Sequence, residues 1–149
     1  MPAWIKLARN ALFAATAAFA AALPIGAAQG QDLSQLAGQW SCKYAMEPFS
    51  GNAMDKHYWE FQLALYPQGQ YQMQGFYYNP VVGQIPVQGE GQWGPQQGPT
   101  GPGIKLQGRQ FRQDQGWGPF QMVAQVGNAQ TLYMQFRGNT HMTNVNCQR

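Results

Sequence analysis

From residue 38 onward, the chain alternates apolar and polar residues with a period of two. In the segment HYWEFQLALY (57–66), Trp59, Phe61, Leu63 and Leu65 fall on one face, and the other face is mostly polar. Successive side chains of a β-strand point to opposite faces, so this pattern predicts a strand that is buried on one side. Helical periodicity is nearly missing, and only DLSQLAG (32–38) allows a short helical turn.

The same reading predicts eight strands. Their approximate ranges are 38–46, 57–66, 70–80, 84–93, 103–111, 120–126, 131–136 and 140–147. Gly, Pro and Asn gather in the turns between them, notably 79–83, 94–103 and 114–119. A meander of this kind has one apolar face to cover, so we expect an all-β fold, a single eight-stranded antiparallel up-and-down β-barrel. The alternative is a β-sandwich.

The chain has two cysteines, one in the first predicted strand and one in the last. By alternation Cys42 shares its face with Trp40, and Cys147 shares its face with Val145. A disulfide between them would join the first strand to the last and close the barrel. The rival interpretation is a redox-active or metal-binding pair, but neither cysteine lies in a CxxC motif.

The first 30 residues have the order of a secretory signal peptide. Lys6 and Arg9 precede an apolar run over 11–27, and small residues follow, with candidate cleavage after Ala28 or Gly30. A retained membrane anchor is the rival, but the run is short and Ala-rich. We therefore expect a signal peptide over 1–30, a barrel domain over 31–149 with no membrane span, and a periplasmic or secreted protein.

Gln dominates the outward face of the predicted sheet. From residue 31 onward there are 22 Gln but only 13 charged residues, of which seven are basic and six acidic. A chain with no basic cluster is a poor partner for nucleic acid. The Gln-rich face reflects either the composition of the organism's proteins or a surface that contacts sugars or another protein through amide hydrogen bonds.

The opening LAGQWSCKY resembles the Gly-x-Trp signature, here Gly38 and Trp40, that begins the first strand of lipocalins and related calycin barrels. The resemblance implies a barrel in which the Trp closes one end and is covered by an Arg, here Arg137 or Arg149. It also implies a small apolar or amphipathic ligand inside the barrel, and no catalysis.

The same opening also resembles the bacterial metalloprotease-inhibitor family. That resemblance implies that the segment corresponding to Gln31–Leu36 enters a protease cleft. It gives a second hypothesis, a protease inhibitor or protein-interaction module that acts through its N-terminal segment and loops. A third hypothesis is a structural envelope protein that contacts polysaccharide.

A carried ligand would lie between the inward aromatic residues and the inward methionines. The residues expected to line this site are Trp59, Phe61, Tyr71, Met73, Tyr77, Phe120, Met122 and Met134. We also expect Phe136 to point inward. Inward glycines at 75, 89, 91 and 108 either leave room for a ligand or permit bends of the strands. Exposed aromatics near loops, Phe76, Tyr78 and Trp117, could instead contact a sugar or a partner.

Catalytic patterns are sparse. The mature chain has no Gly-x-Ser-x-Gly, and Glu60 and Glu90 fall on the polar face as solubilising residues. Asp55, His57 and His141 could ligate a metal only if the fold brought them together, and the alternative is a pair of singly hydrogen-bonded histidines. We therefore expect no enzyme, no cofactor and no metal.

Overall fold

The computed structural model describes residues 33–98 and 101–149, which belong to a unit spanning 31–149. The expected signal peptide lies outside the described residues, as do Gln31 and Asp32. Within the described ranges, no helix has the length and apolar character needed to cross a membrane.

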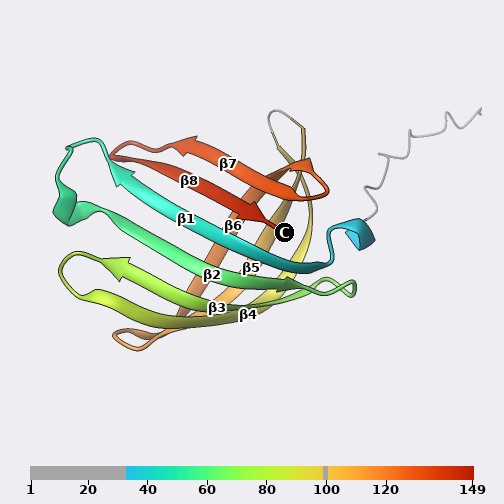
Figure 1. Ribbon diagram of the computed structural model, residues 1–149, viewed down its shortest axis with the longest axis horizontal. Coiled ribbons are helices and arrows are strands. Elements are labelled where there is room, and N and C mark those ends of the chain that lie inside the picture. The colour runs from blue at the N-terminus through green and yellow to red at the C-terminus, as the bar shows by residue number, and fades with distance from the viewer. Residues whose placement is uncertain (1–32, 99–100) are drawn as a thin grey trace, which may run out of the picture. The chain divides into compact units, whose positions relative to one another are not determined.

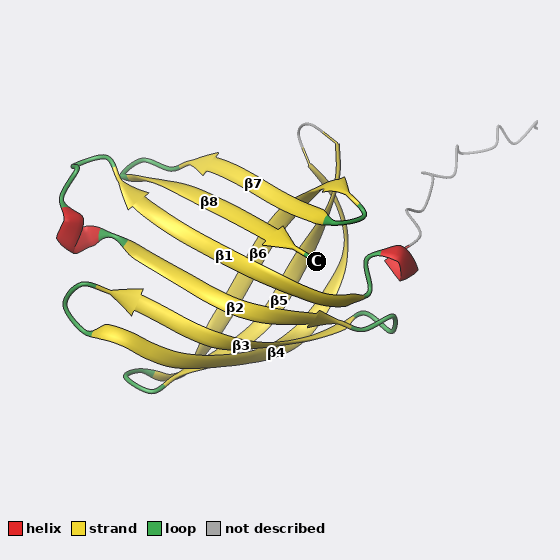
Figure 2. Cartoon of the chain, viewed as in Figure 1, coloured by secondary structure: helices red, strands yellow, loops and turns green. Residues whose placement is uncertain are grey.

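The described residues form eight strands in a closed antiparallel barrel, with each strand paired to its neighbours in chain order (Figure 1). The strands are β1 (Gly38–Pro48), β2 (His57–Leu65), β3 (Gln70–Asn79), β4 (Gly83–Gly98), β5 (Gly101–Arg112), β6 (Gly116–Asn128), β7 (Thr131–Arg137) and β8 (His141–Gln148). Two short 3-10 helices, η1 (Leu33–Gln35) and η2 (Ala53–Asp55), precede β1 and β2 (Figure 2). The predicted up-and-down barrel is confirmed, and the sandwich alternative is not adopted.

The β4–β5 hairpin is longer than predicted, because residues 94–98 and 101–103 belong to strands and not to a turn. β4 extends past the end of β3, whose pairing stops at Gln92, so one edge of β4 is open from there on. The backbone N–H of Trp93 points to that side, where it donates to the Gly69 carbonyl at 2.8 Å. Two residues on, the Pro95 nitrogen faces the same open side, so its missing N–H costs no ladder bond.

Inward glycines permit close approach of strands and leave little empty space. A Cβ on Gly75 would lie 2.0 Å from Glu60 O, and one on Gly108 would lie 2.2 Å from Glu90 O. Gly91 and Gly108 pair directly, and the Tyr71 side chain lies against both. At Gly75, Gly91 and Gly108 the missing side chain is therefore replaced by neighbouring backbone and the Tyr71 ring and leaves no room for a ligand.

The wall between β6 and β7 is the least complete part of the barrel. The two strands pair only through Gln125, Val126 and Asn128 of β6, whereas β7 continues along β8 to Arg137. Phe136 lies beyond that short pairing and is 59% exposed. By register Phe136 lies on the inward face, opposite the buried Thr143, as expected, but it stays outside the buried core because β6 does not pair with β7 at that level.

Closure between the first and last strands follows the prediction. β1 and β8 pair from Ser41–Gln148 to Pro48–His141, and Cys42 stands directly opposite Cys147. The two sulfurs form a disulfide, and both residues are buried. The bond fixes the register at the seam of the barrel.

Loss of the disulfide should destabilise the barrel without erasing it. The bond joins residues 105 positions apart, and the chain-entropy model gives up to about 4.7 kcal/mol for a loop of that order. Replacing both cysteines with Ala should lower the melting temperature while the strand signal in circular dichroism persists in the cold. If both cysteines of the native protein alkylate without reductant, the seam is not closed by this bond.

The close approach of backbone at Gly75 can be tested with a matched pair of variants. Gly75→Ala forces a Cβ into the Glu60 carbonyl, and we expect a loss of about 1–3 kcal/mol of unfolding free energy. Gly94→Ala, in β4 with nothing within 4 Å of the added Cβ, should change stability by less than about 0.5 kcal/mol. Urea unfolding measures both, and equal losses would contradict the close approach.

Candidate functional site

Trp40 is fully buried near the start of β1. Its indole N–H donates to Leu36 O at 2.9 Å, and both residues are buried. The Arg149 guanidinium lies 4.7 Å from the centre of the Trp40 ring and donates to the Ala37 carbonyl. Arg149 is therefore the arginine that covers Trp40, whereas Arg137 lies over the Phe49 ring at 4.4 Å.

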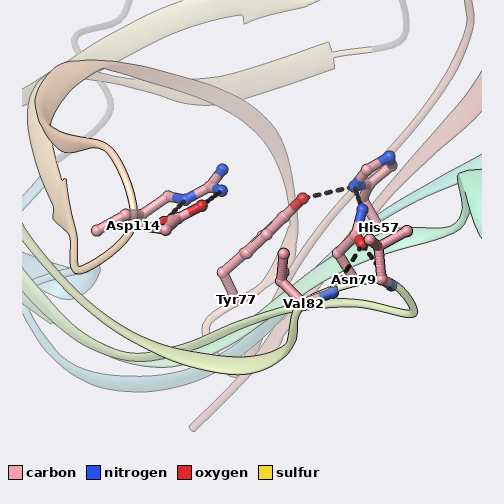
Figure 3. A network of polar contacts seen from close by, with 7 residues as sticks. His57, Tyr77, Asn79, Val82 and Asp114 are labelled. Carbon is pink, nitrogen blue, oxygen red and sulfur yellow. Dashed lines mark hydrogen bonds and ion pairs between the residues drawn. The ribbon is translucent and has the colours of Figure 1, made fainter.

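A polar network occupies the opposite end of the barrel. The Tyr77 hydroxyl and His57 Nδ1 are 2.6 Å apart, and Asn79 Nδ2 lies 3.0 Å from the same nitrogen (Figure 3). On the other side of Tyr77, Arg112 stacks on the ring at 3.7 Å and pairs with Asp114 at 2.6 Å. That hydrogen bond lowers the pKa of the Asp114 carboxyl. Each of these groups therefore has a partner within the network.

The barrel brings together the eight residues expected to line an interior ligand site. These are Trp59, Phe61, Tyr71, Met73, Tyr77, Phe120, Met122 and Met134, all buried except the half-buried Met134. The Phe120 ring centre lies 6.4 Å from those of Phe61 and Tyr71, and the Trp59 and Tyr77 centres are 4.8 Å apart. The rings pack on one another, as in a protein core.

Three buried polar atoms in or near this interior have no hydrogen-bond partner among residues 33–98 and 101–149. They are Trp59 Nε1, the Tyr71 hydroxyl and Gln110 Oε1. Burial, with a contribution from the charge of Glu90, raises the pKa of Tyr71 to about 12, so its hydroxyl stays neutral. An unpartnered buried donor or acceptor costs stability, and a bound molecule could satisfy it.

A large hollow lies on the outer face of the barrel. It has a volume of about 1300 Å³ and spans strands β8, β1, β2, β3 and β4 and the end of β5. We call it the amide groove, after the six amide side chains that line it: Gln62, Gln74, Gln88, Gln113, Asn146 and Gln148. Gln74 and Gln88 make no side-chain hydrogen bond within the described ranges, so their donors and acceptors are available.

The charges in the amide groove cancel. Lys43 Nζ lies 2.9 Å from Glu60 Oε1, and the hydrogen bond to Glu60 raises the pKa of Lys43. Both side chains line the groove and remain about half exposed. The groove therefore offers a neutral surface, with no unpaired cation to attract an anionic ligand.

Apolar surface alternates with the amides. Phe76 of β3, which is 45% exposed, and Phe111 of β5 both line the groove. Next to it, Tyr58 stacks on Tyr78 with ring centres 4.7 Å apart, and Lys43 lies over the Tyr58 ring. Of the aromatics that the sequence placed near loops, Phe76 reaches this groove and Trp117 reaches an adjoining hollow.

The candidate metal ligands are engaged separately. Asp55 accepts from Asn52, His57 contacts Tyr77 and Asn79, and His141 contacts Thr140. In residues 33–98 and 101–149, no group of three or more His, Cys, Asp or Glu side chains is placed to hold a metal ion.

The candidate inhibitory segment is described only from Leu33, where it forms η1 and then buries Leu36.

No family model, curated protein or solved structure matches this chain. The site is therefore defined by its own residues alone.

Sequence reasoning missed the amide groove as a site, although its signal was present. Gln62, Gln74 and Gln88 are outward residues of three consecutive strands, and Gln74 pairs with both of the others. The alternation places them on one face. What the pattern does not contain is the curvature that makes a hollow of this face.

Proposed function

We propose that this chain is an exported, non-enzymatic binding protein that holds a neutral, hydroxyl-rich ligand of the glycan class in the amide groove. The observation that carries the proposal is the lining of the 1300 Å³ hollow, which combines six amides, three phenylalanines and an ion pair that neutralises itself.

The chemistry of the lining fits sugar hydroxyls. A hydroxyl both donates and accepts hydrogen bonds, and each Gln side chain offers two N–H donors and a carbonyl acceptor. The C–H face of a sugar ring can rest on an aromatic ring such as that of Phe76. Since Lys43 and Glu60 already pair, binding should depend little on salt.

Export supports the choice of ligand class. The buried Cys42–Cys147 disulfide is consistent with an extracytoplasmic protein, and residues 1–30 have the pattern of a signal peptide. We place the protein in the periplasm or outside the cell, where envelope polysaccharide is the accessible glycan.

Carriage of an apolar molecule inside the barrel is a second candidate. In its favour, the buried Trp59 Nε1 and Gln110 Oε1 have no partner within the described ranges, and a ligand with a polar group could satisfy them. Against it, the interior rings pack on one another. The inhibitor hypothesis is weaker, since Leu36, at the end of the proposed inhibitory segment, is buried against the barrel.

The groove assignment predicts a specific loss on Phe76→Ala. Removing an aromatic contact should weaken binding to neutral glycans by about tenfold. Tyr133→Ala is the matched control, because Tyr133 is 49% exposed and lies on β7, outside the lining of the groove. Binding to immobilised neutral polysaccharides and oligosaccharides measures both. Equal loss in the two variants, or no binding to any glycan by the wild type, contradicts the proposal.

The carriage candidate is tested by fluorescence titration with fatty acids, retinoids, quinones and tetrapyrroles. If it is correct, a compound quenches tryptophan emission with a dissociation constant below about 100 μM, which corresponds to roughly 5.5 kcal/mol. Trp59→Phe removes the unpartnered indole N–H and should weaken the binding of that compound. Absence of binding across the panel eliminates carriage.

A further inference from the structure

Four hollows on the outer face adjoin one another. Beside the amide groove lie three smaller ones of about 480, 600 and 650 Å³. The groove shares Gln62, Gln74 and Gln88 with the second hollow. The second shares Tyr66, Gln72 and Glu90 with the third, and the third shares Gly91, Gln92 and Gly108 with the fourth. Because each hollow ends on side chains that begin the next, they form one path, which we call the outer track.

The outer track follows the outward row of β4. Gln88, Glu90 and Gln92 stand at the three successive junctions, and Gln96 lies in the fourth hollow. Outward residues recur every two positions, so at 3.3–3.4 Å per residue Gln88, Glu90 and Gln92 stand about 7 Å apart. Gly94 leaves the next position without a side chain, and Gln96 follows at about 27 Å from Gln88. A lining with a regular spacing suits a ligand with a regular spacing.

An aromatic wall borders the second hollow. Trp117 of β6 lines it and is 49% exposed. Its ring centre lies 5.6 Å from that of Phe111, which lines the amide groove, and Arg109 stacks on it at 4.5 Å. Arg109 also pairs with Glu90 at 2.6 Å. The second hollow therefore resembles the first in its amides and its aromatic ring, and the charge of its Glu90 is cancelled by Arg109, which lines the third hollow.

We infer that the outer track binds a linear neutral glycan chain over several sugar units, with the amide groove as one of a series of subsites. The inference rests on the proposed function and extends it from one sugar-binding hollow to a polymer-binding path. Each hollow contributes hydrogen bonds from free amides, such as those of Gln74, Gln88 and Gln92, which have no side-chain partner in the described chain. The apparent affinity should then rise with the length of the chain.

The face is less suited to an extended peptide. Peptides commonly bind sheets by adding a strand to an open edge, where main-chain hydrogen bonds supply affinity. β1, β2 and β3 are paired on both sides along the track, so their backbone groups are already used. In the first three hollows only side chains face the ligand, and these are mainly amides and aromatics with paired charges. The open edge of β4 lies in the fourth hollow, together with Lys105, which has no ion pair within the described ranges.

The test compares chain lengths and variants in the full-length mature protein by isothermal titration calorimetry. Linear neutral glucan and N-acetylglucosamine oligosaccharides serve as probes, from disaccharides to long oligomers, with an uncharged Gln- and Ser-rich peptide in parallel. We expect the wild type to bind a long oligomer at least about tenfold more tightly than the disaccharide of the same series. Trp117→Ala and Gln92→Ala should each reduce that ratio. Gln121→Ala, an exposed outward residue of β6 that lines none of the four hollows, should leave it unchanged.

The outcomes distinguish the outer track from the proposed glycan binding in the amide groove. Affinity that is the same for short and long oligomers, while Phe76→Ala still weakens both, overturns the track and leaves the single groove. Failure of every glycan to bind overturns both. Tighter binding of the peptide than of any oligosaccharide overturns the choice of glycan. If Trp117→Ala lowers the melting temperature, Gln92→Ala decides, because its side chain is exposed and makes no side-chain hydrogen bond within the described ranges.

Discussion

Closure of the sheet between β1 and β8 is the constraint on which the rest of the structure depends. A meander with one apolar face cannot remain open in water, and with no long helix in the described chain to cover that face, the sheet covers itself. The Cys42–Cys147 bond holds the first and last strands in one register. Closure uses most backbone groups in ladders, so side chains on the outer face are what the protein can offer to a ligand.

One wall of the barrel separates the packed interior from the amide groove. At Gly75 the neighbouring strand approaches so closely that a Cβ would overlap Glu60 O, and Gly75 and Phe61 also line the amide groove. Space that could have served a ligand inside the barrel is therefore small where the aromatic rings pack, and the hollow lies on the other side of the same wall. This relation links the packing of the core to the position of the candidate site.

Most of the fold could be predicted from the sequence, because alternation with a period of two shows which residues share a face of a strand. The positions of Cys42 and Cys147 on the inward face then imply the pairing of the first strand with the last. The sequence could not predict features that depend on how strands end relative to one another. Phe136 is exposed because β6 leaves β7 early, and Pro95 lies in a strand because β3 has already ended. The choice of Arg149 over Arg137 as the cover of Trp40 also needed the three-dimensional path of the chain end. The sequence showed the amide groove only as outward Gln residues on neighbouring strands, because alternation predicts which residues share a face but not how the sheet curves.

The central claim is that the ligand lies on the outer face and not inside the barrel. Nuclear magnetic resonance of the side-chain N–H groups tests it directly, with a neutral oligosaccharide added to the labelled protein. The account predicts that the amide signals of Gln62, Gln74 and Gln88 shift while the indole N–H signal of the buried Trp59 does not. A shift of the Trp59 signal with unchanged Gln signals would contradict the account and place the ligand in the interior.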